Sequence, residues 1–202
     1  MRSIARARIT DHINHHLGPI VRSWDELSDG SALPFAIVQI EEQPASDALT
    51  FITVGLSGSE LTFPSGRPTR QELMFACYDT GITPQKVSGL LATVALDSAT
   101  TGRAIARGEV EGPAGPLFDG SRLEALYASL PAYFPDAFAV CEQSEPPTHF
   151  LWMIPITRTE AAFVKSHGWS RFEDLLVKFD PDLLDLNRGE IELPPSNISI
   201  LP

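Results

Sequence analysis

The stretch HFLWMIPITRTEAAFVKSHGWSRFEDLLVKFDPDLLDL, residues 149–186, holds the signals that decide the fold. It opens with the apolar run HFLWMIPI, whose Pro155 indicates an edge position or a β-bulge because proline has no N–H for a strand ladder. Thr157 and Glu160 follow in the T-x-x-E pattern of a capping box, which predicts the start of a helix. The sequence therefore predicts a strand that leads directly into a helix.

A second helix is expected after a tight bend. Gly168 is suited to the left-handed conformation that ends a helix. Ser170 and Glu173 repeat the capping-box pattern, which predicts that the second helix starts at once. Trp169, directly after the glycine, is expected to pack across the bend. This end of the chain therefore looks architectural rather than catalytic.

Upstream of this stretch the pattern changes from strands to a helix. Three runs rich in β-branched and aromatic residues, 35–40, 49–54 and 71–79, predict strands in an antiparallel meander. From Thr83 the pattern TPQKVSGLLATVAL predicts a helix, with proline at its first position and apolar residues three and four apart. The segment LEALYASLP, 123–131, fits a helix or a strand, and its pattern does not decide between them.

Composition limits the class of protein. The chain has 202 residues, of which 43% are hydrophobic, and this suits one globular domain. It has no apolar run of about 20 residues and no apolar centre near its start, so a soluble, cytoplasmic protein is expected. The net charge of −11 argues against nucleic acid as a partner and favours a basic protein. Cys77 and Cys141 are expected to be buried free thiols.

Two motifs could carry chemistry, and each also has a simpler interpretation. His12 and His16 lie four residues apart in ITDHINHHL, a predicted helix capped by Thr10 or Asp11, so both rings would share one face and could hold a metal. The general base of an H-E-x-x-H motif is missing, and partly exposed histidines are the simpler interpretation. The serines of VGLSGSE lack the full G-x-S-x-G pattern, and a turn after a strand accounts for them.

Several ordered segments resemble the bacterial branch of the suppressor-of-fused family. They are ITVGLSG (52–58), RQELMFACYD (70–79), GLLATVALDS (89–98), RGEVEGPAGPLFDGSRLEALYASLP (107–131), and WMIPITRTEAAFVKSHGW followed by DLLVKFDPDLLDLNR. The resemblance covers about residues 35–188. It implies an α+β fold with a central, mostly antiparallel sheet and flanking helices, in which 123–131 is a strand. One globular unit is expected, with a helical extension at 1–34 and an extended tail at 189–202.

The resemblance also implies a function. Animal members of the family bind a transcription factor by clamping a short peptide as an added strand, and bacterial members are commonly proposed to be immunity proteins that neutralise toxins. The fold is not known as an enzyme fold, and no cofactor is expected. In the animal protein an acidic residue after the central helix contacts the peptide, and the matching step here is Gly108-Glu109.

These observations predict a non-catalytic domain that sequesters a basic protein partner, such as a toxin. The expected contact residues are Glu109 and Glu111, with Glu41 and Glu42 as weaker acidic candidates. The alternative from a different class is a small metal-dependent hydrolase that uses His12, His16 and a carboxylate. A self-associating structural domain is a third interpretation, and the sequence leaves the oligomeric state open.

Overall fold

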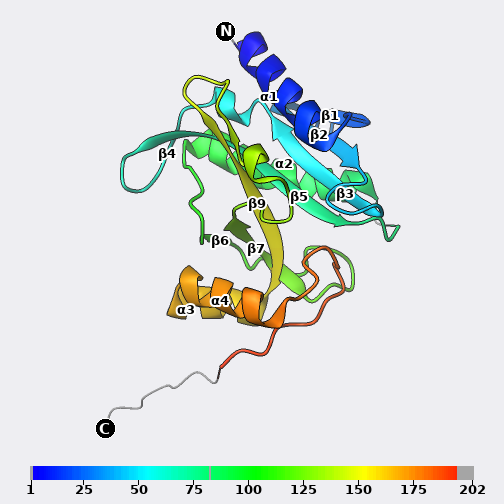
Figure 1. Cartoon of the computed structure of the whole chain (residues 1–202), viewed down its shortest axis with the longest axis vertical. Coiled ribbons are helices and arrows are strands. Elements are labelled where there is room, and N and C mark those ends of the chain that lie inside the picture. Colours follow the sequence, from blue (N-terminus) through cyan, green and yellow to red (C-terminus); the bar gives the residue numbers. More distant parts are fainter. Residues whose placement is uncertain (1, 82, 195–202) are drawn as a thin grey trace.

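Figure 1 shows the computed structural model of the chain, which describes residues 2–81 and 83–194. The strands are β1 (Arg22–Glu26), β2 (Ala32–Glu41), β3 (Ala48–Val54), β4 (Leu61–Thr62), β5 (Pro68–Tyr78), β6 (Val110–Glu111), β7 (Leu123–Ser129), β8 (Val140–Cys141) and β9 (Thr148–Thr157). The helices are α1 (Arg2–Leu17), α2 (Pro84–Thr101), α3 (Arg158–His167) and α4 (Trp169–Phe179), and the short 3-10 turns are η1 (Leu56–Gly58) and η2 (Asp136–Phe138).

The strands form a nine-stranded sheet in the order β1-β2-β3-β5-β9-β7-β6, with β4 paired to β5 and β8 paired to β9. Among the strands of the described residues, only β5 and β9 run parallel, and the other pairs are antiparallel. The predicted meander is confirmed as β2, β3 and β5, and the segment 123–131 contains strand β7. The α+β class with a central, mostly antiparallel sheet and flanking helices is therefore confirmed.

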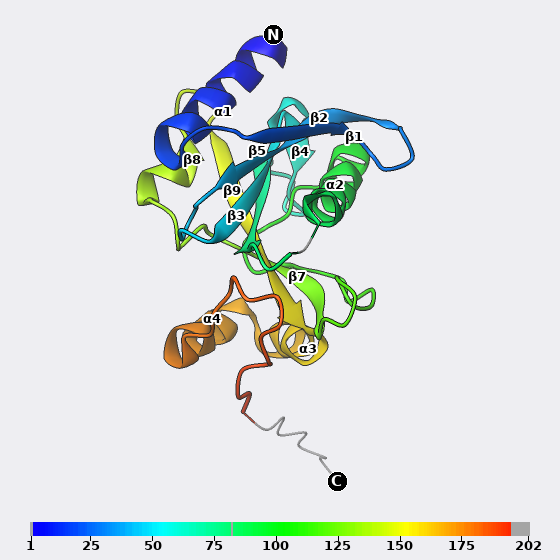
Figure 2. The ribbon, with the colours of Figure 1, turned by 90° about the vertical axis from the view of Figure 1, so that its right-hand side faces the viewer.

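Both faces of the central strands are buried, and for this reason β3 shows no alternation of polar and apolar residues. On one face, Phe51 belongs to a cluster that includes Val87 and Leu91 of α2. On the other face, Ile52 belongs to a cluster with Ile9 of α1. Figure 2 shows α1 and α2 on different sides of the sheet. Two helices far apart in sequence thus remove the two faces of one sheet from water, which is the main favourable term in folding.

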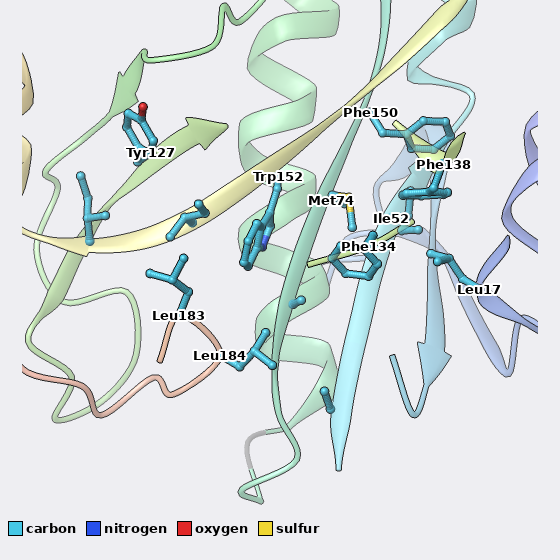
Figure 3. Close-up of a cluster of buried hydrophobic side chains, with 14 of the residues drawn as sticks. Leu17, Ile52, Met74, Tyr127, Phe134, Phe138, Phe150, Trp152, Leu183 and Leu184 are labelled. Carbon is cyan, nitrogen blue, oxygen red and sulfur yellow. The ribbon is translucent and has the colours of Figure 1, made fainter. Parts of the chain in front are cut away.

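The cluster on the α1 face continues to the C-terminal part of the chain, as Figure 3 shows. Trp152 of β9 is 1% exposed and its ring meets Phe134 edge to face, with centroids 6.2 Å apart. Leu183 and Leu184 belong to the same cluster. They lie in residues 180–194, a segment of turns and irregular structure that we call the strap. The strap therefore completes the core.

Strand β9 lies in the middle of the sheet, so the edge position predicted from Pro155 is wrong for the strand as a whole. The reason that proline is tolerated is local. β5 pairs with β9 over 148–152, whereas β7 pairs with it over 152–157. Within the described part of the chain, Pro155 therefore has a strand neighbour on one side only, and on the other side its carbonyl oxygen accepts a hydrogen bond from Arg188 at 3.0 Å. No strand there needs the missing N–H.

The two predicted capping boxes have different outcomes. The first is confirmed: Thr157 Oγ1 accepts from the Glu160 N–H at 3.1 Å, and Glu160 Oε2 accepts from the Thr157 N–H at 2.8 Å. The second is wrong, because α4 starts at Trp169 with Gly168 as its cap and no side-chain cap bond. The Glu173 carboxylate binds partners on the sheet instead.

Residues 1–34 contain more than the expected helical extension. Helix α1 starts at Arg2, so Thr10 and Asp11 lie inside the helix and do not cap it. Strand β1 follows and pairs with β2 at one end of the sheet. The expected tail, 189–202, is described only as far as residue 194, and up to there it forms no helix or strand. Within the described residues, no helix is long and apolar enough to cross a membrane.

Candidate functional site

Glu109 and Glu111, the first two predicted contact residues, lie at and beside strand β6 and share one cation. Arg103 Nη2 donates to Glu109 Oε2 and Arg103 Nη1 donates to Glu111 Oε1, both at 2.7 Å. Residues two apart in an extended chain point to the same side, so one planar guanidinium can reach both carboxylates. The hydrogen bond to Glu111 and the charges of both carboxylates raise the pKa of Arg103. The group carries a net charge of about −1.

The edge of the sheet at β6 is open. β6 stands at the end of the strand order, and its inner edge pairs with β7 through Val110 opposite Tyr127 and Glu111 opposite Leu126. Within residues 2–81 and 83–194, no strand pairs with its outer edge. An open strand edge presents backbone donors and acceptors to which another chain can bind.

An apolar hollow of about 520 Å³, which we call the β7–β8 groove, includes residues 105–107 in its lining, and these come shortly before β6 in the chain. Residues 149–151 of β9 form one side of the groove. The strand beside β9 changes at this place, because β8 pairs with residues 148–149 and β7 pairs with β9 from residue 152 onward. Its apolar lining includes Phe63, Ile105, Leu130, Val140 and Leu151. Leu130 is 45% exposed, so part of this apolar surface faces solvent.

Residues 105–107, which line the groove, are also held by α4 through Arg107. Arg107 forms an ion pair with Glu173, whose Oε1 also accepts from the Tyr127 hydroxyl at 2.9 Å and from Ser129 Oγ at 3.2 Å. The Arg107 guanidinium lies 4.8 Å from the Trp169 ring centroid. Burial, and then the hydrogen bond to Glu173, raise the pKa of Tyr127. These contacts hold residue 107 between the groove and α4.

The weaker candidates, Glu41 and Glu42, lie elsewhere. They are exposed and stand at the end of β2, where Gln39 Nε2 donates to Glu41 Oε1 at 3.3 Å. In the sheet order, β3, β5, β9 and β7 separate β2 from β6. The four predicted contact residues therefore form two separate acidic sites rather than one surface.

The histidines of α1 pack against aromatic side chains. His12 is 8% exposed, its Nε2 lies 3.0 Å from the carbonyl oxygen of Phe138, and its ring stacks on Phe138 and Phe150. The ring centroids of His12 and His16 are 4.6 Å apart, but the described residues contain no group of three His, Cys, Asp or Glu side chains able to hold a metal. The structure gives the hydrolase alternative no support, and His12 packs in the core.

Sequence reasoning missed one buried carboxylate. Glu72 is fully buried, and its oxygens accept from the Thr53 and Ser57 hydroxyls and from three backbone N–H groups of residues 55–57. Burial raises the pKa of Glu72, and these hydrogen bonds oppose the rise. The serine of VGLSG therefore lies in a turn after a strand, as predicted, where it binds this carboxylate. A glutamate inside a buried strand next to a Gly-Ser turn was the available signal.

The fold is similar to those of several solved structures. A suppressor of fused homologue from Neisseria gonorrhoeae FA 1090 matches with a TM-score of 0.72 and 18% identity, over 96% of this chain and 100% of that one. The Sufu–Fu complex matches with a TM-score of 0.67 and 16% identity, over 92% and 91% of the two chains. Drosophila Suppressor of Fused gives 0.58 and 16%, over 78% of this chain and 43% of that one. A comparison with curated protein sequences gives no match.

Fold and site together define an α+β sheet domain with an open edge strand beside an apolar groove. The profile of a protein family described as Suppressor of fused protein (SUFU) matches residues 31–189, which is most of the chain. The chain therefore belongs to the suppressor of fused family, as the sequence resemblance predicted.

Proposed function

We propose that this chain is a non-catalytic protein-binding domain that sequesters a partner protein by accepting an extended segment of it along β6. The observation that carries the proposal is the outer edge of β6, which has no strand partner among the described residues. Membership of a family in which Sufu is solved in complex with Fu supports it. An added strand would gain backbone hydrogen bonds at this edge, and pockets for its side chains would give specificity.

The acidic side chains beside the edge would select the partner. A lysine or arginine on the added strand would meet the Glu109 and Glu111 carboxylates, which one guanidinium neutralises only in part. Their side chains are 27% and 28% exposed, so they are accessible but partly shielded from water. Charged pairs in such a place are stronger than pairs on an open surface. Glu41 and Glu42 would form a second, weaker contact with a large partner.

More specifically, we propose that the protein is a cytoplasmic immunity protein that neutralises a basic bacterial toxin. The net charge of −11 supports this form, because a strongly acidic domain steers a basic partner and speeds their encounter. The same charge disfavours nucleic acid, whose phosphates require lysine and arginine.

The test is a pull-down from native lysate with the whole chain, at low and at high salt, followed by mass identification and titration of any stoichiometric partner. We expect a basic protein that salt releases, and we expect Glu109→Lys to weaken its binding about tenfold, since charge reversal at a partly buried contact costs more than 1 kcal/mol. The matched control is Asp25→Lys, an exposed change on β1 at the other end of the sheet.

The possible outcomes test separately the contact at β6, the basic partner and the binding function. Equal losses of affinity in Glu109→Lys and Asp25→Lys would show a general charge effect and would remove β6 as the contact. A stoichiometric partner that is not basic would agree with the protein-binding function but would contradict a basic toxin as the target. If neither salt concentration retains a stoichiometric partner, the binding function itself fails. Thermal unfolding of each variant shows whether the fold is intact.

A further inference from the structure

The β7–β8 groove differs in charge from the rest of the molecule. The chain has 26 acidic and 15 basic side chains, yet none of the fifteen residues that line the groove is Asp or Glu. Three of the lining residues are basic: Arg67, Arg107 and His149. The groove is therefore an apolar hollow with a positive rim in an acidic protein.

The three basic residues are not equally available. Arg107 forms an ion pair with Glu173, so its charge is largely balanced. Arg67 is exposed at the end of the turn between β4 and β5, where its guanidinium lies 5.2 Å from the Phe63 ring centroid, and it forms no ion pair with the described residues. His149 is exposed at the start of β9. Arg67 is thus the free charge on the rim.

We infer that the groove binds an apolar side chain of the partner segment that is flanked by a carboxylate, with Arg67 as the residue that selects the acid. This inference rests on the proposed function and names the chemistry of the docked segment. An apolar side chain would cover Leu130 and Val140, which removes exposed hydrocarbon from water. A neighbouring aspartate or glutamate would pair with the fork of Arg67, which matches a carboxylate with two donors.

A basic residue at the same place would be repelled by Arg67 and would find no acid among the lining residues. The groove therefore discriminates by charge in two ways, through attraction of an acid and rejection of a base. The acidic residues at β6 have the opposite preference. A partner that is basic overall would carry this acidic and apolar segment as its anchor.

The experiment selects peptides from a library of random dodecapeptides on the whole chain and, in parallel, on Arg67→Glu. We expect the wild-type protein to enrich peptides with Asp or Glu next to Leu, Ile or Phe. Their affinity should fall about fivefold in Arg67→Glu, which is the scale of one partly exposed ion pair. Arg22→Glu, on exposed β1 at the far end of the sheet, makes the same charge change and should leave these affinities unaltered.

Failure of the inference and failure of the proposed function give different results. Enriched peptides without acids, or acidic peptides that bind Arg67→Glu and wild type equally, would overturn the inference while peptide binding stands. If the library yields no enriched sequence, the proposed binding function fails and this inference fails with it. Thermal unfolding of Arg67→Glu confirms that the exposed substitution leaves the fold intact.

Discussion

The guanidinium of Arg188 and the carboxylate of Glu160 form a two-pronged ion pair, with both N–O distances 2.8 Å, where the side chains are only 5% and 0% exposed. Arg188 also donates to the carbonyl oxygens of Pro155 and Gly189, each at 3.0 Å. Glu160 belongs to the capping box of α3, so this one pair joins the strap, the start of α3 and the end of β9. The strap is therefore anchored by charge as well as by its leucines.

Replacement of Arg188 should destabilise the protein strongly. Arg188→Met keeps the length of the side chain but leaves the Glu160 charge buried without its partner, which costs about 3–5 kcal/mol in the free energy of unfolding. Urea titration measures the change. The matched control is Arg158→Met. The side chains of Arg158 and its ion-pair partner Glu124 are 63% and 22% exposed, so this pair should contribute less than about 1 kcal/mol to the free energy of unfolding. Similar unfolding midpoints for both variants would show that the buried pair does not hold the strap.

Burial of Cys77 makes stability depend on pH above neutrality. Burial, with a smaller effect of the Asp79 charge, raises the pKa of this thiol from 9.0 to about 12. The folded state therefore keeps the proton in a range where the unfolded state loses it, so stability is complete below pH 9 and falls as the pH rises toward 12.

The matched comparison for Cys77 is with Cys77→Ala. Between pH 8 and 10.5 the wild type should lose about 2 kcal/mol more than the variant, because one pKa unit corresponds to about 1.4 kcal/mol. The urea midpoints at the two pH values give the difference. If both proteins lose the same stability over this range, then the thiol ionises equally in the folded and unfolded states.

Local patterns in the sequence predicted the elements that local contacts determine. The Thr157–Glu160 capping box closes within four residues, and the structure has it as predicted. The same pattern at Ser170 and Glu173 failed, because the Glu173 carboxylate binds Arg107, Tyr127 and Ser129, which are 44 to 66 residues away. A sequence pattern cannot weigh such tertiary partners against a local cap.

In the candidate site, too, some features were predicted from the sequence and others depend on tertiary contacts. Glu109 was predicted as a contact residue from the family resemblance and Glu111 was predicted with it, but their shared partner Arg103 was not, because a strand spacing of two does not say which cation lies beside it. The β7–β8 groove was not predicted at all, since its lining comes from segments that the fold brings together between residues 63 and 151. The open edge at β6 likewise depends on the order of strands in the sheet, which the sequence did not give.

Acid should weaken the attachment of α1 through His16. Burial, followed by the nearby charges of His12 and His15, lowers the pKa of His16 below 6.5. Because the unfolded state then binds the proton more tightly, the stabilising contribution is lost as the pH falls below 6.5. From pH 7 to pH 5 the melting temperature of the wild type should fall further than that of His16→Gln. His149→Gln, an exposed change outside this cluster, is the control and should follow the wild type.

Gly108, directly before Glu109, should not tolerate a side chain. Its φ is 90°, and a Cβ atom at this position would overlap the Trp169 side chain, which lies across the glycine. Gly108→Ala should cost about 2–4 kcal/mol, from the overlap together with the left-handed backbone. The urea midpoint measures this loss.

Removal of the indole separates the two causes at Gly108. In a Trp169→Ala background the overlap is absent, so Gly108→Ala should cost only the backbone part, about 1–2 kcal/mol. An equal cost in both backgrounds would mean that the ring does not press on the glycine. Since residue 108 leads into β6, Gly108→Ala should also weaken partner binding at that edge, whereas Gly189→Ala, at a glycine in the strap with open space around it, should not.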